Sequence, residues 1–244
     1  MNEQTLDQLK KLKLYGMHHS FKNALESQTL NSLTADELIG MLIQSEVDDR
    51  NNRTLQRGLL NARFRYKASI EDLDFGTERA LDKNLVYRLS ECTYISKSEN
   101  VLITGSTGTG KSYLSCALGN QACILGKKVF YANANRLFTQ LKMAKADGSI
   151  IKEMAKIERQ DLVILDDFGI QPIDAQSRMI LMEIIEDRHG KKSTMITSQL
   201  PVDAWYEAIG DATLADAIMD RVVHDAHRIN LKGESLRRKR KLTE

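Results

Sequence analysis

The sequence predicts an α/β protein with a mostly parallel central sheet covered by helices, and a small helical domain in front of it. Two observations predict this arrangement. From about residue 82 onward, short apolar runs alternate with amphipathic stretches, as strands and helices do in a parallel sheet. Before residue 68, such apolar runs are missing and leucines recur at near-helical spacing.

The first part of the chain has the pattern of a helical domain. Thr34 is followed three positions later by Glu37, which is typical of a capped helix start, and this helix is expected to run on toward Lys67. Valine, isoleucine and glycine are rare here, which argues against strands. We therefore expect a helical domain over residues 1–68 and a second, α/β domain over residues 69–244.

The second part predicts four strands and the helices between them. Because each strand is followed by a helix, the strands should be parallel and the helices should cover both faces of the sheet. The expected strands are 100–104, 128–132, 162–165 and 193–198. The expected helices are 82–92, 112–125, 136–145, 150–159, 176–189, 203–209 and 214–223.

The composition favours a protein that works inside the cell. The three cysteines, Cys92, Cys116 and Cys123, form no closely spaced pair, which argues against a disulfide framework or a zinc site. No apolar run is long enough to span a membrane, and the start of the chain does not resemble a signal peptide. A cytoplasmic protein with no membrane partner is the expectation.

A phosphate-binding loop follows the first predicted strand. Residues 105–112 match the pattern GxxxxGK[ST], with a strand before the loop and a helix after it. The glycines allow backbone N–H groups to surround phosphate, Lys111 supplies positive charge, and the Ser112 hydroxyl is a ligand for Mg²⁺. We therefore expect ATP and Mg²⁺ as ligands, bound by Gly105, Ser106, Thr107, Gly108, Thr109, Gly110, Lys111, Ser112 and Tyr113.

Two acids at the end of the third predicted strand complete this pattern. Asp166 and Asp167 follow four apolar residues, at the edge of the sheet where α/β proteins place their ligands. Asp166 is the expected magnesium residue together with Ser112, and Asp167 is the candidate for orienting the attacking water. Many ATPases of this type carry glutamate at the second position, so the shorter Asp167 predicts slow turnover.

Later polar residues allow two interpretations each. Thr197, Ser198 or Gln199, at the end of the fourth predicted strand, could sense the γ-phosphate or could simply cap the strand. Arg221 could reach a neighbouring subunit's γ-phosphate, although by itself an Asp220–Arg221 surface pair is the simpler interpretation. Arg237 is equally open when taken alone.

These motifs in this order resemble the IstB transposition helpers, which are AAA+ ATPase partners of IS21-type transposases. The resemblance covers essentially the whole chain, and its more specific part is Asp-Asp-Phe-Gly followed later by Met-Asp-Arg. The segments that carry it are residues 12–17, 105–112, 162–169, 196–199, 219–221 and 235–238.

The resemblance implies a role for each residue and several partners. Lys111, Asp166, Asp167 and Ser198 or its neighbours would form the ATPase site, with Arg221 as arginine finger and Arg237 as a sensor-II-like arginine. It also implies homo-oligomers on double-stranded DNA with ATP between subunits, and recruitment or stimulation of an IS21-type transposase. Few residues follow Arg237, so little or no C-terminal helical lid is expected.

Other functions remain as alternatives. A DnaC-like replicative helicase loader shares the ATPase core and the late Met-Asp-Arg, but the leucine-rich start suits the transposition helpers better. A metabolic P-loop kinase would need an acceptor pocket and a lid, and no segment resembles either. DNA phosphates could be met by basic residues, or these could be ordinary solvated side chains. The candidates are Arg50, Arg53, Arg57, Arg63, Arg65, Lys67, Lys142, Lys145, Lys152 and residues 237–241.

Overall fold

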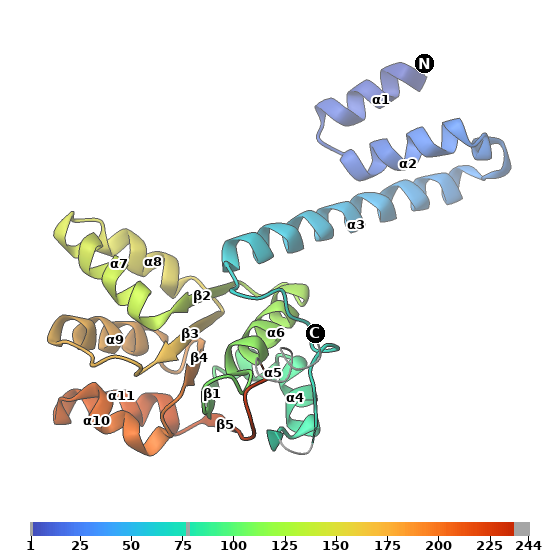
Figure 1. Ribbon diagram of the computed structural model, residues 1–244. Coiled ribbons are helices and arrows are strands. Elements are labelled where there is room, and N and C mark those ends of the chain that lie inside the picture. The colour runs from blue at the N-terminus through green and yellow to red at the C-terminus, as the bar shows by residue number, and fades with distance from the viewer. Residues whose placement is uncertain (1, 77–78, 237–244) are drawn as a thin grey trace. The chain divides into compact units, whose positions relative to one another are not determined.

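The computed structural model describes residues 2–76 and 79–236 and divides the chain into two compact units, residues 1–57 and 58–244 (Figure 1). The predicted boundary at residue 68 stays a prediction. Among the described helices, none is long and apolar enough to cross a membrane.

The first unit is helical, as expected. It contains α1 (Asn2–Lys11), α2 (Tyr15–Glu26), the 3₁₀ turn η1 (Thr29–Ser32) and most of α3 (Ala35–Ala62). The predicted cap is present at the start of α3, where Glu37 N donates to Thr34 Oγ1 and Thr34 N donates to the Glu37 carboxylate. These reciprocal bonds satisfy backbone donors that a helix start leaves unpaired.

Gly16 allows α2 to approach the backbone of α3. A Cβ at Gly16 would lie 2.2 Å from the Ser45 carbonyl oxygen, which is closer than any side chain tolerates. At the same place, the buried Glu46 carboxylate accepts hydrogen bonds from the N–H groups of Gly16 and Met17. Glycine and a carboxylate at the helix start together hold the two helices in contact.

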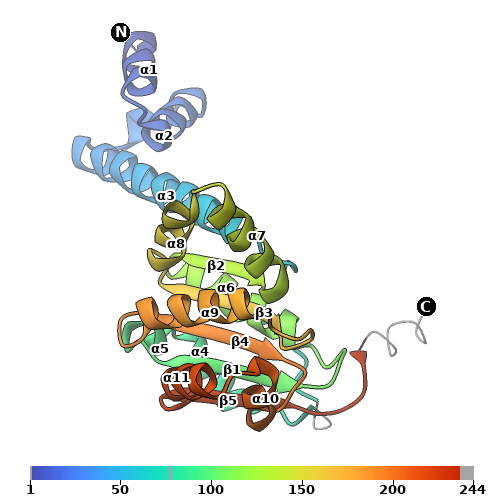
Figure 2. The same ribbon diagram turned by 90° about the vertical axis from the view of Figure 1, so that its left-hand side faces the viewer.

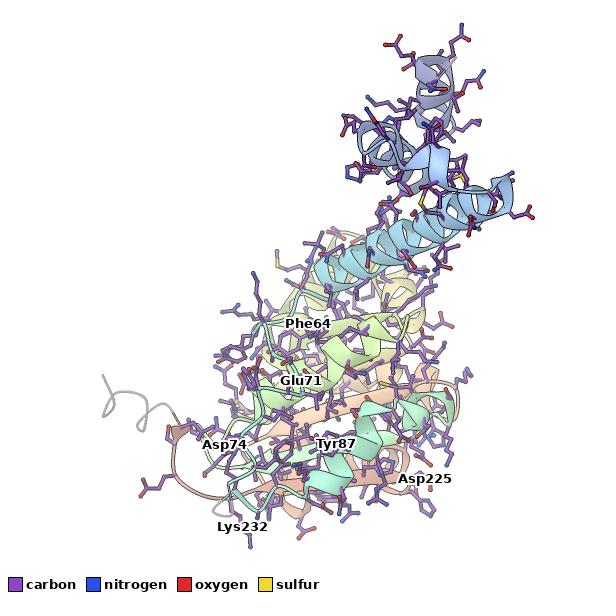
Figure 3. The ribbon with its side chains drawn as sticks, turned by 90° about the vertical axis from the view of Figure 1, so that its right-hand side faces the viewer. Phe64, Glu71, Asp74, Tyr87, Asp225 and Lys232 are labelled. Atoms are coloured by element: carbon purple, nitrogen blue, oxygen red, sulfur yellow. The ribbon has the colours of Figure 1, made fainter. Side chains whose placement is uncertain are left out.

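α3 ends at Ala62 and does not continue toward Lys67 as predicted. Arg63 has a φ of +57°, a left-handed conformation that stops a helix. An extended connector, residues 63–76, then leads to α4 (Lys83–Ser90). Figure 3 shows the labelled residues Phe64, Glu71 and Asp74 in line along this segment.

The second unit is built on one parallel sheet of five strands in the order β2-β3-β4-β1-β5 (Figure 2). The predicted parallel sheet is confirmed, and β4 lies between β1 and β3. The strands are β1 (Asn100–Gly105), β2 (Val129–Asn133), β3 (Leu162–Phe168), β4 (Ser193–Ser198) and β5 (Ala226–Leu231). This order brings the carboxyl ends of β1, β3 and β4 together at one edge.

Helices cover both faces of the sheet. Figure 2 shows α6 (Lys111–Ile124) with α4 and α5 (Thr93–Ser96) on one face of the sheet and the helices between β2 and β5 on the other. The remaining elements are α7 (Ala134–Ala146), α8 (Ile150–Glu158), α9 (Ala175–Arg188), the 3₁₀ turn η3 (Val202–Ala204), α10 (Trp205–Ile209) and α11 (Ala212–Val223).

β5 is the strand that the sequence analysis missed. Only its alternate residues Ile229 and Leu231 are buried, with the exposed Asn230 between them, because it lies at the edge of the sheet. The inner strands β1 and β3 differ from it, since buried apolar residues dominate their centres, as in strands covered on both faces.

The contact at Gly16 gives a prediction for the first unit. Gly16→Ala should destabilise the packing of α2 on α3 by about 1–3 kcal/mol, because the new methyl group overlaps the backbone of Ser45. Gly40→Ala, in α3 with no atom within 4 Å of an added Cβ, should stabilise by about 0.5–1 kcal/mol. Hydrogen exchange of residues 15–57 measures both changes, and effects of the same sign would contradict this packing.

Candidate ATPase site

The phosphate-binding loop adopts a backbone path that depends on its glycines. Gly105, Gly108 and Gly110 all have positive φ angles, between +87° and +143°. A Cβ at Gly105 would meet the Leu231 carbonyl oxygen of β5 at 2.3 Å, and one at Gly108 would meet Ser235 Oγ at 2.1 Å. The loop is therefore held closely by β5 and by the residues that follow it, including Leu236, whose N–H donates to the Gly108 carbonyl.

Lys111 and Ser112 begin α6, at the end of the loop. The buried Lys111 ammonium lies 2.7 Å from the Gly105 carbonyl and 2.8 Å from that of Ser106. Ser112 Oγ donates to Asp166 Oδ1 at 2.9 Å. The predicted strand–loop–helix arrangement therefore brings a cation, a hydroxyl and a carboxylate to one place.

Asp166 is completely buried at the end of β3. A buried carboxylate needs hydrogen-bond partners, and three hydroxyls supply them. Ser112 and Thr197 donate to its Oδ1, and the Tyr131 hydroxyl of β2 donates to its Oδ2 at 2.5 Å. Burial and this hydrogen bond raise the pKa of Tyr131, so the phenol stays a donor.

Asp167 points toward the same place because β3 is irregular there. Adjacent side chains of a regular strand face opposite sides. Here the register with β4 shifts between Leu165 and Phe168, and Asp167 has a φ of +61°. Asp167 Oδ2 accepts a hydrogen bond from Asn133 Nδ2 at the end of β2. Such a bulge re-aims a side chain beside a functional site.

The three sensor candidates at the end of β4 have different partners. Thr197 Oγ1 donates to Asp166 and accepts from the Asp167 N–H, so it joins the two acids. Gln199 Oε1 accepts from Thr107 Oγ1 of the phosphate-binding loop at 2.7 Å. Ser198 is fully buried and donates to the Phe168 carbonyl, which favours strand-end capping for that residue. A sensor role for Ser198 stays a prediction.

Arg221 lies away from its own phosphate-binding loop. The Asn100 side chain, at the first residue of β1, donates to the Arg221 carbonyl, whereas the loop follows the last residue of β1. The guanidinium pairs with Glu186 of α9 at 2.7 Å, and not with Asp220 as the surface-pair interpretation proposed. Arg237 lies outside the described residues.

Two arginines at the site were not recognised from the sequence. Arg79 is buried and donates from Nη2 to the Thr109 carbonyl and from Nη1 to the Asp74 carbonyl, so it holds the phosphate-binding loop from outside. Arg65 was expected among possible DNA contacts, but its Nη1 lies 3.1 Å from Asp167 Oδ2 and 3.6 Å from Asp166 Oδ2. Neither position has a motif that signals such a contact in advance.

The comparisons with known proteins identify the family. Residues 7–244 match the family described as IstB-like ATP binding protein. The chain belongs to this family. A protein named as an insertion-sequence ATP-binding protein from Sinorhizobium fredii is 44% identical over 96% of both chains. Another, named for insertion sequence IS21 of Pseudomonas aeruginosa, is 30% identical over 96% of this chain and 88% of its own.

The solved structures support the fold. The DnaC helicase loader superposes with a TM-score of 0.55 at 19% identity, over 71% of this chain and 98% of that chain. At this identity the likeness shows the AAA+ P-loop fold alone. The predicted resemblance and fold class are confirmed, and family membership makes the IstB-like chain an ATP-binding protein of the transposition-associated AAA+ ATPases.

Thr197 gives a prediction about the two acids. Thr197→Val removes the hydroxyl that orients Asp166, so ATP hydrolysis should fall about 10- to 100-fold, with a smaller loss of nucleotide affinity. Thr197→Ser keeps the hydroxyl and should retain most of the activity. Steady-state kinetics and nucleotide titrations of both variants measure this, and a serine variant as defective as the valine variant would contradict it.

Proposed function

We propose that this IstB-like chain is a DNA-binding ATPase of the cytoplasm that regulates transposition. It assembles on double-stranded target DNA as a homo-oligomer with ATP between subunits, and it recruits or stimulates an IS21-type transposase. The observation that carries the proposal is the placement of Arg221, which makes each site incomplete within one chain. Family membership supports the transposition context.

Arg221 is proposed to serve the ATP of a neighbouring subunit. Its carbonyl is held by Asn100 at the first residue of β1, and the phosphate-binding loop begins at Gly105. Five residues of extended strand separate these positions by roughly 16 Å. An arginine at that edge cannot act on the γ-phosphate of its own chain, but it can act in a head-to-tail oligomer.

Within each chain, the remaining groups suit hydrolysis of Mg·ATP. The Ser112 hydroxyl and the Asp166 carboxylate are oxygen donors of the kind that Mg²⁺ prefers, and they already lie 2.9 Å apart. Mg²⁺ would neutralise charge on the β- and γ-phosphates. Lys111 would add positive charge, Asp167 would orient water, and Gln199, beside Thr107, is the better-placed γ-phosphate sensor.

The ion pairs narrow the choice of DNA contacts. Arg50 and Arg53 are paired with Glu46 and Asp49, and Lys142 is paired with Asp174. Five of the other candidates are exposed and have no acidic partner among the described residues: Arg57, Arg63, Lys67, Lys145 and Lys152. These five are proposed to contact phosphates, whereas residues 237–241 lie outside the described chain.

A DNA-binding titration tests this part of the proposal. With ATP present, the affinity for duplex DNA should be similar for different DNA sequences. It should fall steeply as salt rises, because phosphate contacts release counterions. Changing Lys145 and Lys152 together to Gln should reduce the slope of log affinity against log salt by about two. An affinity that barely changes with salt would contradict it.

The identity of the stimulating partner separates two functions. A transposition regulator should hydrolyse ATP faster on duplex DNA and with its transposase. Stimulation by a replicative helicase alone would instead favour a helicase loader.

Arg221 gives the sharpest prediction. Arg221→Ala should still bind ATP but should lose about 10³-fold or more in hydrolysis, since an arginine finger stabilises charge only in the transition state. Arg159→Ala, an exposed arginine at the end of α8, is the matched control and should hydrolyse ATP normally. Nucleotide binding and turnover are measured on both. Normal turnover by Arg221→Ala would contradict the finger role.

A further inference from the structure

The connector between α3 and α4 is fixed on the phosphate-binding helix. The Phe64 ring lies against Gly119 of α6, where an added Cβ would come within 2.6 Å of it, and it meets the Tyr131 ring edge-on at 6.2 Å. Asn120 Nδ2 donates to the Ala68 carbonyl at 2.9 Å. These two contacts, on either side of Arg65, determine where that residue lies.

Arg65 therefore meets both acids of the site. Its Nη1 is 3.1 Å from Asp167 Oδ2 and 3.6 Å from Asp166 Oδ2. Asp166 is completely buried, and its other contacts are the neutral hydroxyls of Ser112, Tyr131 and Thr197. The Arg65 guanidinium therefore places a positive charge within ion-pair distance of both acids.

The Arg65 side chain is also able to move away from the two acids. It is 43% exposed, so solvent is open to it, and its guanidinium lies over the Tyr66 ring at 5.4 Å while it pairs with the acids. A partly exposed ion pair of this kind is weak enough to exchange for another cation.

We propose that Arg65 competes with Mg²⁺ for the Asp166–Asp167 pair, so that it sets the magnesium requirement of nucleotide binding. This inference rests on the proposed Mg·ATP site. A divalent cation bound between Ser112 and Asp166 would lie beside the guanidinium, and two cations next to one another repel. Binding of Mg·ATP therefore requires Arg65 to move off the acids. Without magnesium, Arg65 offsets repulsion between the acids and the phosphates.

The test is binding of a fluorescent ATP analogue to the full chain over a range of free Mg²⁺ concentrations. Arg65→Gln should reach half-maximal binding at roughly three- to tenfold lower Mg²⁺ than the wild type. In excess EDTA the same variant should bind the analogue more weakly than the wild type. Arg65→Lys retains the charge, so its Mg²⁺ requirement should lie between those of the wild type and Arg65→Gln. Arg159→Gln, which removes the same charge from an exposed arginine at the end of α8, should behave as wild type.

The outcomes distinguish failure of the Arg65–Mg²⁺ competition from failure of the proposed Mg·ATP site. An unchanged Mg²⁺ requirement in Arg65→Gln, or weaker binding at every Mg²⁺ concentration, overturns the competition. An equal shift in Arg159→Gln overturns it as well, because the effect would then be one of net charge. A wild-type chain that binds no nucleotide at any Mg²⁺ concentration overturns the proposed site along with it.

Discussion

The buried carboxylate of Asp166 is the constraint on which the rest of the site depends. A charge without solvent exposure must be met by donors, and here these come from α6, β2 and β4 through Ser112, Tyr131 and Thr197. Those donors can converge only if β3 lies between β2 and β4, as the strand order has it. The strand order is therefore what allows the buried Asp166 to be hydrogen-bonded.

The same sheet separates the two halves of the proposed catalytic machinery. The phosphate-binding loop and both acids lie at the carboxyl ends of the strands, and Arg221 lies at the beginning of β1. Under the proposed arginine-finger role, this division lets a single chain bind ATP but leaves it without a group needed for efficient hydrolysis. In the proposed oligomer, hydrolysis would then depend on a neighbouring subunit being in place.

Much of the fold and of the phosphate-binding site could be predicted from local sequence. The phosphate-binding loop and Asp166 belong to contiguous patterns whose chemistry fixes their spacing, and strands β1 and β3 are apolar because both of their faces are buried. β5 was missed because polar residues surround its buried Ile229, whereas the other edge strand, β2, is apolar over its first four residues.

The contacts of Arg65 and Arg79 could not be predicted, since they join residues that only the fold brings together. Arg65 lies 102 positions from Asp167 in the chain, and Arg79 lies 30 positions from Thr109. A local pattern carries no information about such pairs. The end of α3 was not predicted either. It is set by the left-handed conformation of Arg63, after which the connector begins.

The central claim, that ATP is hydrolysed between subunits, is tested most directly by mixing two inactive variants. Lys111→Ala lacks the nucleotide-binding cation and keeps Arg221, whereas Arg221→Ala has the opposite defect. Equal mixing should restore up to about a quarter of wild-type hydrolysis if the subunits assemble at random in a head-to-tail oligomer. A mixture no more active than its separate components, although mixed oligomers are recovered through a tag on one variant, would contradict the account.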